Sequence, residues 1–319
     1  MRFLTLLVLL ALGPQPVGAR PQTTTRAAAP SAADLNRMLA RFFETADEYE
    51  KVFRNLTAEE TKRIEVFKKS GAFDKQRQIV SDLIVYRSAR DSSGVTIEYR
   101  DVQSVDGKAV ERRGPRALQL LTKAATADNV HKELTAIAKE TRRYEFDSHV
   151  MGLTIHQGNV MAMRGRRDSF AIEWVGRDQI AGRDVVIIDY RQTGTVGKDG
   201  WQLSLPREFG EPEHVHRGRL WLDAETFQLR RQVWELLTPH PAAPDPILML
   251  RQEAVYAPSR FGILVPERIV LDFLFHFSHP KNGPPSMALS ERLTFTYGAF
   301  RRFDVATEEQ IGVPATGDR

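Results

Sequence analysis

The sequence contains no cysteine among its 319 residues, which excludes disulfide bonds, thiol catalysis and a lipid anchor attached through cysteine. Nor is there a large excess of one charge, because 45 Lys and Arg residues face 41 Asp and Glu residues. The arginine clusters have no interleaved aromatic residues, so we expect no nucleic-acid partner. No stretch after residue 19 has the roughly twenty apolar residues that a bilayer-spanning helix needs. We therefore expect a soluble protein, not a membrane-spanning one, stabilised by burial of apolar side chains alone.

Catalytic and cofactor-binding motifs are missing as well. The sequence has no Gly-x-Ser-x-Gly elbow and no phosphate-binding glycine loop. The nearest approach to a metal site is His214 with His216, because histidines two residues apart on a strand point to the same face. No third ligand can be assigned, so we expect no metal and no cofactor. The sequence favours a protein that is not an enzyme, and a metal-assisted hydrolase built on these two histidines stays open as an alternative.

The N-terminus has the pattern of a secretory signal peptide. Arg2 precedes an apolar run at residues 3–12, and the segment closes with the small residues Val17-Gly18-Ala19. We predict cleavage after Ala19 and a mature protein that is periplasmic or secreted. Residues 20–30, rich in Thr, Ala and Pro, are expected to form a disordered leader, and residues 31–319 a single α+β domain.

Helical periodicity is strongest just after this leader. Apolar residues recur every three to four positions over Asp34–Arg54, which predicts a long first helix. A shorter helix is predicted over Ala58–Lys69, where a threonine precedes the segment and a glycine follows it. Helical composition returns at residues 116–121 and 130–144, which predicts a helical insertion in the middle of the chain.

Between these helical segments the pattern changes to a period of two. Val95–Tyr99 alternates apolar and polar residues, and Gln76–Ser88 is long enough to pair with it. We expect a hairpin across Asp91–Gly94 and a further turn at Asp106-Gly107. Residues 31–150 are therefore predicted to be rich in helix with one early hairpin.

Beyond residue 167 the sequence predicts antiparallel strands, because apolar stretches are joined by connections of hairpin size. Three such connections are Gly176–Gly182, Asp223–Thr226 and Ala257–Gly262. The predicted fold class is α+β, with a curved antiparallel β-sheet, a half-barrel, packed on the long N-terminal helix and interrupted by the helical insertion. Residues 151–319 are expected to form the sheet.

One predicted strand, over residues 269–277, carries five large apolar groups on one face. This face would pack on the core helix, or part of it would line a hydrophobic ligand cavity where the helices leave the sheet uncovered. The candidate ligand-binding residues are Ile269, Leu271, Phe273, Phe275 and Phe277.

Three stretches resemble the bacterial outer-membrane lipoprotein carriers of the LolA and LolB type. They are residues 218–226 running into 229–232, the hairpin at residues 261–266, and the final strand Phe295–Phe303. The resemblance implies a half-open sheet that curves around helices over an apolar cavity. We therefore expect an exported protein that binds or carries an apolar ligand, with lipid or lipoprotein acyl chains as the partner. A non-catalytic structural role in the cell envelope is a further alternative.

Overall fold

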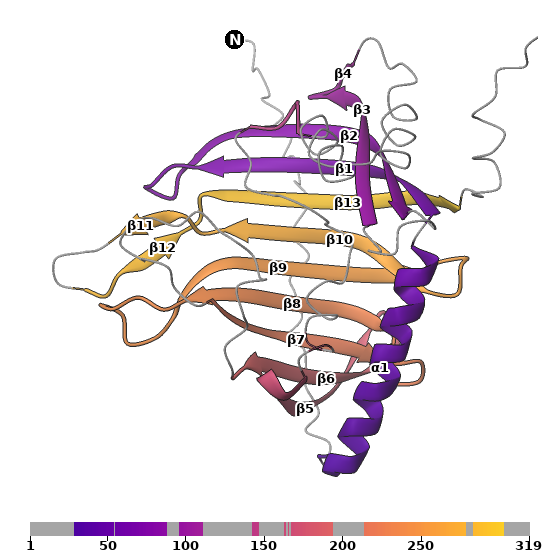
Figure 1. Cartoon of the computed structure of the whole chain (residues 1–319). Helices are drawn as coiled ribbons and strands as arrows, with labels where there is room; N and C mark the ends of the chain where they lie inside the picture. Colours follow the sequence, from indigo (N-terminus) through magenta and orange to yellow (C-terminus); the bar gives the residue numbers. More distant parts are fainter. Residues whose placement is uncertain are drawn as a thin grey trace, which may run out of the picture.

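In the computed structural model, eleven strands form one long antiparallel sheet that does not close into a barrel (Figure 1). The strands follow the order β4-β3-β2-β1-β13-β10-β9-β8-β7-β6-β5, so β4 and β5 lie at the two edges. The structure describes residues 29–53, 55–87, 96–110, 142–146, 167–193, 214–278 and 283–302, together with Met163 and Gly165. The elements are α1 (Ala32–Val52), β1 (Asn55–Phe67), β2 (Phe73–Arg87), β3 (Thr96–Val105), β4 (Lys108–Ala109), the 3-10 turn η1 (Arg167–Ser169), β5 (Phe170–Ile180), β6 (Arg183–Gln192), β7 (Val215–Asp223), β8 (Leu229–Thr238), β9 (Ile247–Pro258), β10 (Leu264–Phe273), β11 (His276–Ser278), β12 (Ser286–Ala288) and β13 (Glu291–Arg302).

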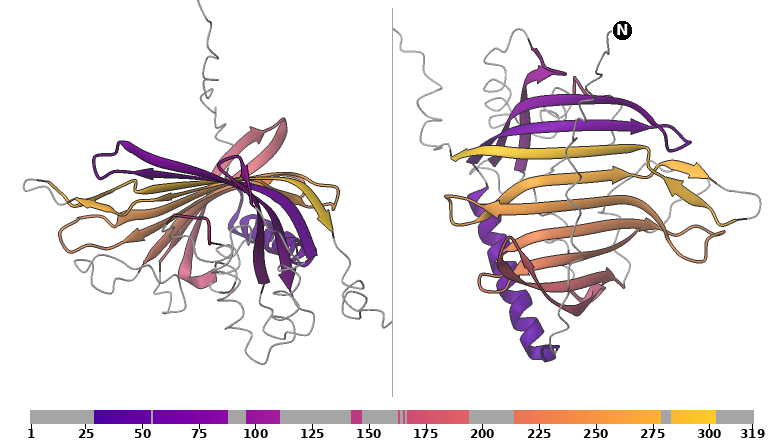
Figure 2. Two further views of the ribbon diagram at one scale, coloured as in Figure 1. Left: turned by 90° about the horizontal axis from the view of Figure 1, so that it is seen from above. Right: turned by 180° about the vertical axis from the view of Figure 1, so that it is seen from behind.

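The sheet is curved, and α1 lies on its concave side (Figure 2). We call this side the inner face and the opposite side the outer face. Alternate residues of each strand point inward, as Leu293, Phe295 and Tyr297 of β13 do, and they join Phe42 and Tyr49 of α1 in the main core. The predicted fold class, a curved antiparallel sheet packed on a long N-terminal helix, is confirmed.

The helix α1 begins and ends two residues earlier than the predicted Asp34–Arg54. The Ser31 hydroxyl accepts a hydrogen bond from the Asp34 backbone N–H at 3.1 Å and so caps the helix. The buried residues of α1 recur every three or four positions and therefore form a single stripe. Figure 1 shows that α1 crosses the strands near one of their ends and does not extend to the other end. The buried stripe consists of Leu39, Phe42, Ala46 and Tyr49.

The predicted hairpins are confirmed for β2 with β3, β7 with β8, and β9 with β10. At the predicted turn after β3, Asp106 and Gly107 both have positive φ, 50° and 77°. This is the backbone conformation that a tight two-residue hairpin requires, and Asp and Gly adopt it at low cost. The connections at Asp223–Thr226 and Ala257–Gly262 fall between strands as expected.

The predicted second helix, Ala58–Lys69, is wrong, because this segment belongs to strand β1. Its side chains alternate with a period of two, so that Ala58, Glu60 and Lys62 are buried. Glu60 and Lys62 are charged and still point inward, where each has an ionic partner. Because two of the inward-pointing residues are charged, apolar and polar residues do not alternate in this part of the sequence. The segment was therefore predicted to be a polar helix.

Two details of the predicted strands also need correction. The strand expected over residues 269–277 stops at Phe273, where the Leu274 N–H donates to the Met249 carbonyl at 2.9 Å, and the chain then enters the separate two-stranded sheet of β11 and β12. The connection expected over Gly176–Gly182 is shorter, because β5 continues to Ile180 and turns at Ala181-Gly182. Gly176 instead lies at a bulge within β5.

Several predictions fall outside the described residues. They concern the signal peptide at residues 1–19, most of the leader, and the helical segments at 116–121 and 130–141. The last residues of the predicted helix, Arg142–Tyr144, are described and form a turn. The division into a leader and a single domain stays a prediction.

Candidate functional site

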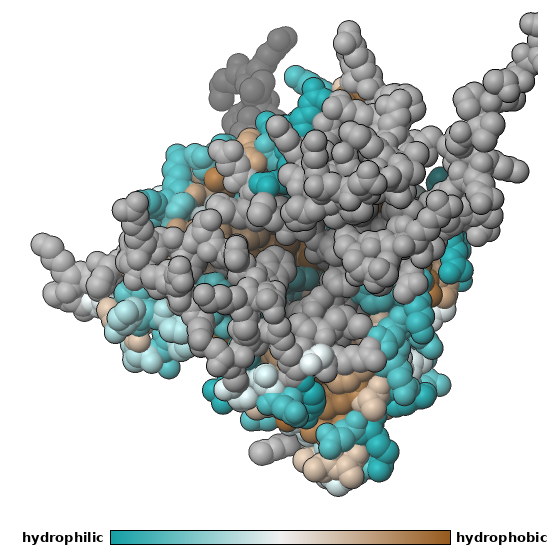
Figure 3. Space-filling view, in the orientation of Figure 1, coloured by the Kyte–Doolittle hydropathy of each residue, from teal (hydrophilic) through white to brown (hydrophobic). Residues whose placement is uncertain are grey.

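A pocket of about 450 Å³ opens where the N-terminal half of α1 meets β5, the edge strand of the sheet. Its floor is apolar and comes from three elements: Met38 on α1, Trp174 on β5 and Phe227 in the β7–β8 connection. Figure 3 shows apolar side chains beside the lower part of α1, bordered by hydrophilic ones. We call this the helix-edge pocket. Its remaining lining residues are Pro30, Asp34, Arg37, Arg41 and Arg177.

The floor of the helix-edge pocket lies at the periphery of the main core. Trp174 and Phe227 pack against the main core from its periphery. Further along α1 the helix and the sheet are in close contact, and the space between Phe42, Tyr49 and Leu264 measures only about 10 Å³. A ligand that enters the pocket therefore meets a tightly packed core behind it.

The backbone of Phe227 is held in an unusual conformation at this pocket. Its φ of 60° lies in the left-handed region, which costs a residue with a side chain about 1 to 2 kcal/mol. The Thr45 hydroxyl of α1 donates to the Phe227 carbonyl at 3.2 Å, and the Phe227 N–H donates to the Asp223 carbonyl at 2.9 Å. These contacts fix the aromatic ring at the pocket floor.

The rim of the helix-edge pocket carries three arginines and one carboxylate. Asp34 pairs with Arg37, and the hydrogen bond from the Ser31 hydroxyl lowers the pKa of Asp34, so this carboxylate is ionised at neutral pH. Arg41 contacts Glu44 on the same helix at 3.3 Å. Arg177 is exposed and pairs with no described residue. The rim therefore favours a ligand that carries negative charge.

The five predicted ligand-binding residues divide into two groups. Ile269, Leu271 and Phe273 are buried in the main core. Phe275 and Phe277 lie beyond the end of β10 and pack around a smaller apolar cluster. The structure does not place the five on one strand face, and none of them is among the described residues that line the helix-edge pocket.

A buried ionic cluster occupies the inner face at β1 and β3. Arg100 donates to both oxygens of Glu60 at 2.6 and 2.9 Å and to Glu98 at 3.0 Å. Burial disfavours the Arg100 charge, but the two carboxylates outweigh burial and raise the pKa of Arg100 further. Beside this group, Lys62 pairs with Glu145 at 2.5 Å, and both side chains are almost fully buried. Burial lowers the pKa of Lys62, and Glu145 opposes that shift.

The two candidate metal ligands lie at the start of β7, and each is engaged with a protein neighbour. His214 Nδ1 is 2.9 Å from the Thr238 hydroxyl, and His216 Nδ1 accepts a hydrogen bond from Trp234 Nε1 at 3.1 Å. The His216 ring also stacks on the Trp234 ring, with centroids 5.5 Å apart. Within the described residues, no three His, Asp or Glu side chains gather as a metal site.

The His216 ring makes protein stability depend on pH. Burial, and to a smaller extent the nearby His214, lowers the pKa of His216 to about 4. The unfolded chain takes up a proton near pH 6.5, whereas the folded chain resists it until about pH 4. The stability contributed by neutral His216 is therefore full above pH 6.5 and lost as the pH falls towards 4.

We predict that His216→Phe weakens this pH dependence. Between pH 7 and pH 4, the free energy of unfolding of the unsubstituted protein should fall by about 2 kcal/mol more than that of the variant. Chemical denaturation at several pH values measures this difference in slope. Equal slopes for the two proteins would show that His216 titrates as an ordinary exposed histidine.

No local sequence pattern groups Met38, Trp174 and Phe227. Met38 belongs to the apolar stripe of the first helix, and Trp174 to a predicted strand, so each reads as an ordinary core residue. Phe227 directly follows the predicted connection Asp223–Thr226 and precedes the next predicted strand. Its position beside that connection points to no partner.

Comparisons with known proteins give matches among solved structures. No protein-family model and no curated protein matches the chain. An outer membrane lipoprotein-sorting protein domain from Vibrio parahaemolyticus is 7% identical, with 85% of this chain and 98% of that chain covered and a TM-score of 0.31. A DUF1329 family protein from Desulfovibrio piger is 10% identical, with coverage of 85% and 95% and a TM-score of 0.31. The Mycobacterium tuberculosis lipoprotein LppX is 9% identical, with coverage of 85% and 98% and a TM-score of 0.24.

Within the described residues, no helix combines the length and hydrophobicity that crossing a membrane requires.

Proposed function

We propose that the protein is an exported binding or carrier protein for an apolar ligand with an anionic head group. The observation that carries this proposal is the helix-edge pocket, where an apolar floor continuous with the main core meets a rim with three arginines. An acyl chain would lie on Met38, Trp174 and Phe227, with its head group at the arginine rim. A lipid or the acyl chains of a lipoprotein would supply such a ligand.

The energetics favour entry of an acyl chain at this position. Each buried methylene group contributes about 0.8 kcal/mol to the free energy of binding, so burial of several carbons offsets the conformational entropy that the acyl chain loses. The space behind the pocket, beside Phe42 and Tyr49, holds only about 10 Å³. A long chain would therefore enter by displacing α1 from the sheet edge.

The proposed location is the periplasm or the exterior of the cell. Support comes from the sequence, in which an apolar run after Arg2 ends at the small residues before the predicted cleavage after Ala19. Because the chain has no cysteine, its folding requires no disulfide formation in either location.

We predict that Met38→Glu weakens the binding of a fluorescent fatty-acyl probe at least tenfold. The substitution places a carboxylate on the apolar pocket floor, where an acyl chain would strip it of water and where it repels an anionic head group. Met38 is only half-buried, so the fold should tolerate the change. Fluorescence titration measures the dissociation constant, with thermal unfolding recorded for each protein.

Ala40→Glu is the matched control, because Ala40 is exposed on the same helix and receives the same charge. Binding by this variant should stay within about twofold of the unsubstituted protein. Equal weakening by both substitutions would mean that charge on α1, not the pocket floor, decides binding. No saturable binding by the folded unsubstituted protein would contradict the proposed function itself.

A further inference from the structure

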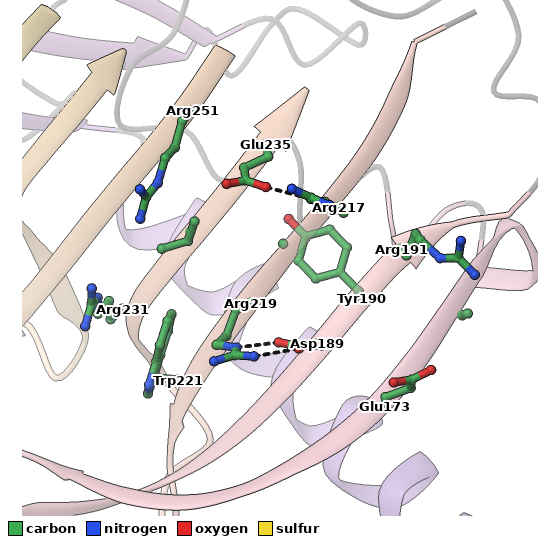
Figure 4. A pocket seen from close by; sticks show the side chains of 13 residues that line it. Glu173, Asp189, Tyr190, Arg191, Arg217, Arg219, Trp221, Arg231, Glu235 and Arg251 are labelled. Atoms are coloured by element: carbon green, nitrogen blue, oxygen red, sulfur yellow. Dashed lines mark hydrogen bonds and ion pairs between the residues drawn. The ribbon is translucent and has the colours of Figure 1, made fainter. Parts of the chain in front are cut away.

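The outer face carries a groove of about 500 Å³ across β5 to β9 (Figure 4). We call it the arginine groove. It is separate from the helix-edge pocket, since its charged residues are at the outward positions of their strands. Five arginines and three carboxylates line it, a formal excess of two positive charges. The charged lining residues are Arg191, Arg217, Arg219, Arg231, Arg251, Glu173, Asp189 and Glu235.

Strand register brings four of these residues into one row. Arg191 of β6 is directly opposite Arg217 of β7, Arg217 is opposite Glu235 of β8, and Glu235 is opposite Arg251 of β9. Like charges directly opposite one another destabilise a sheet. Arg191 and Arg217 therefore form a facing pair of positive charges, and an anion bound between them would relieve their mutual repulsion.

Only some of the arginines have a close carboxylate of their own. Arg219 holds Asp189 with two hydrogen bonds of 2.5 and 2.7 Å, and Arg217 contacts Glu235 at 2.6 Å, as the dashed lines in Figure 4 show. Arg191 is exposed and pairs with no described residue. Arg251 reaches a carboxylate only at 4.0 Å. The row therefore contains positive charge that the surrounding carboxylates do not neutralise.

Two buried donors in the arginine groove have no acceptor among the described residues. They are Trp221 Nε1 and Arg231 Nε, although a terminal nitrogen of Arg231 pairs with Glu253 at 3.0 Å. The Arg231 guanidinium lies 4.6 Å from the centre of the Trp221 ring, and the Arg219 guanidinium 5.8 Å from it. Such stacking holds the planar guanidinium groups in fixed orientations. The groove thus presents oriented hydrogen-bond donors and an excess of positive charge, and it has fewer carboxylates than arginines.

From this geometry we infer that the arginine groove binds a small anion with two or more negative charges, of the phosphate-ester class, with Arg191 and Arg217 as its main ligands. A guanidinium group can donate two parallel hydrogen bonds to phosphate oxygens, so a phosphate group suits the space between these two arginines. The volume lies within the range of roughly 300 to 1,000 Å³ that small-molecule pockets occupy. A hollow lined with alternating charges suits a compact anion better than a flat membrane surface.

The experiment is calorimetric titration of the full-length mature protein with inorganic pyrophosphate. The test variant is Arg191→Gln with Arg217→Gln. The control variant is Arg63→Gln with Arg268→Gln, which removes the same charge from exposed positions of β1 and β10. In the control, too, one arginine pairs with a carboxylate, because Arg63 contacts Glu65 at 2.8 Å.

We expect saturable one-to-one binding that the test variant weakens at least tenfold and the control variant by less than twofold. Vesicles that contain phosphatidic acid, whose phosphomonoester head group can carry two negative charges, identify the source of the phosphate group: binding that needs Arg191 and Arg217 indicates a lipid head group, and no vesicle binding indicates a free phosphate ester. Absence of saturable pyrophosphate binding, equal weakening by the control, or binding of an oligoglutamate peptide alone would overturn the inference.

Discussion

Replacing Phe42 with alanine should lower the free energy of unfolding by about 3 to 5 kcal/mol, the range for truncating a buried aromatic side chain. Phe42 is 1% exposed and lies at the centre of the α1 stripe, against the sheet. Its ring neighbours the Phe43 ring at 5.5 Å between centroids. The loss combines the transfer of the ring to water with the cavity left behind, so it measures directly how firmly α1 is docked.

Phe73→Ala is the matched control for this prediction, because the Phe73 side chain is 51% exposed. Its replacement should change stability by less than about 1 kcal/mol, since little apolar area is lost. Chemical denaturation followed by circular dichroism measures both variants. A change within roughly 0.5 kcal/mol for Phe42→Ala, which is typical of surface positions, would show that α1 does not pack on the sheet.

Replacing Arg100 with methionine should also cost about 3 to 5 kcal/mol, because it leaves buried carboxylates without their cation. Arg100 is 7% exposed, and Glu60 is fully buried beneath it. A carboxylate in that position must bind a proton or disrupt the surrounding packing.

Arg63→Met serves as the control, because Arg63 is exposed on strand β1 and pairs with Glu65. An exposed ion pair contributes at most about 1 kcal/mol, so this variant should stay close to the unsubstituted protein. Chemical denaturation of both variants at neutral pH provides the comparison. A loss below about 1 kcal/mol for Arg100→Met would mean that water reaches the buried cluster.

Periodicity predicted the long helix and most hairpins because those elements depend on local patterns. The apolar stripe around Phe42 can be read from spacing alone, and the turn at Asp106-Gly107 from residue type alone. The error at Ala58–Lys69 has a tertiary cause. The buried Glu60 carboxylate is balanced by Arg100, which lies forty residues later and two strands away, and no local pattern contains that information.

The candidate sites were harder to predict because strand register and the packing of α1 on the sheet create them. The arginine groove brings together Arg191, Arg217 and Arg251, which lie in three strands and form no cluster in the sequence. The helix-edge pocket likewise joins Met38 to Trp174 across more than one hundred residues. The strand predicted over residues 269–277 was too long for the opposite reason. Its regular apolar pattern continues past Phe273, where the hydrogen bonding of the chain changes and the strand ends.

The most direct test of the proposed carrier function is native mass spectrometry of the protein purified from its own cell envelope, with lipid extraction of the same sample. The proposal predicts a population whose mass exceeds that of the polypeptide by one acyl-containing molecule, which extraction in organic solvent releases. The Met38→Glu protein, purified in the same way, should carry much less of it. Folded protein that carries no such molecule, from cells in which it is exported, would contradict the account.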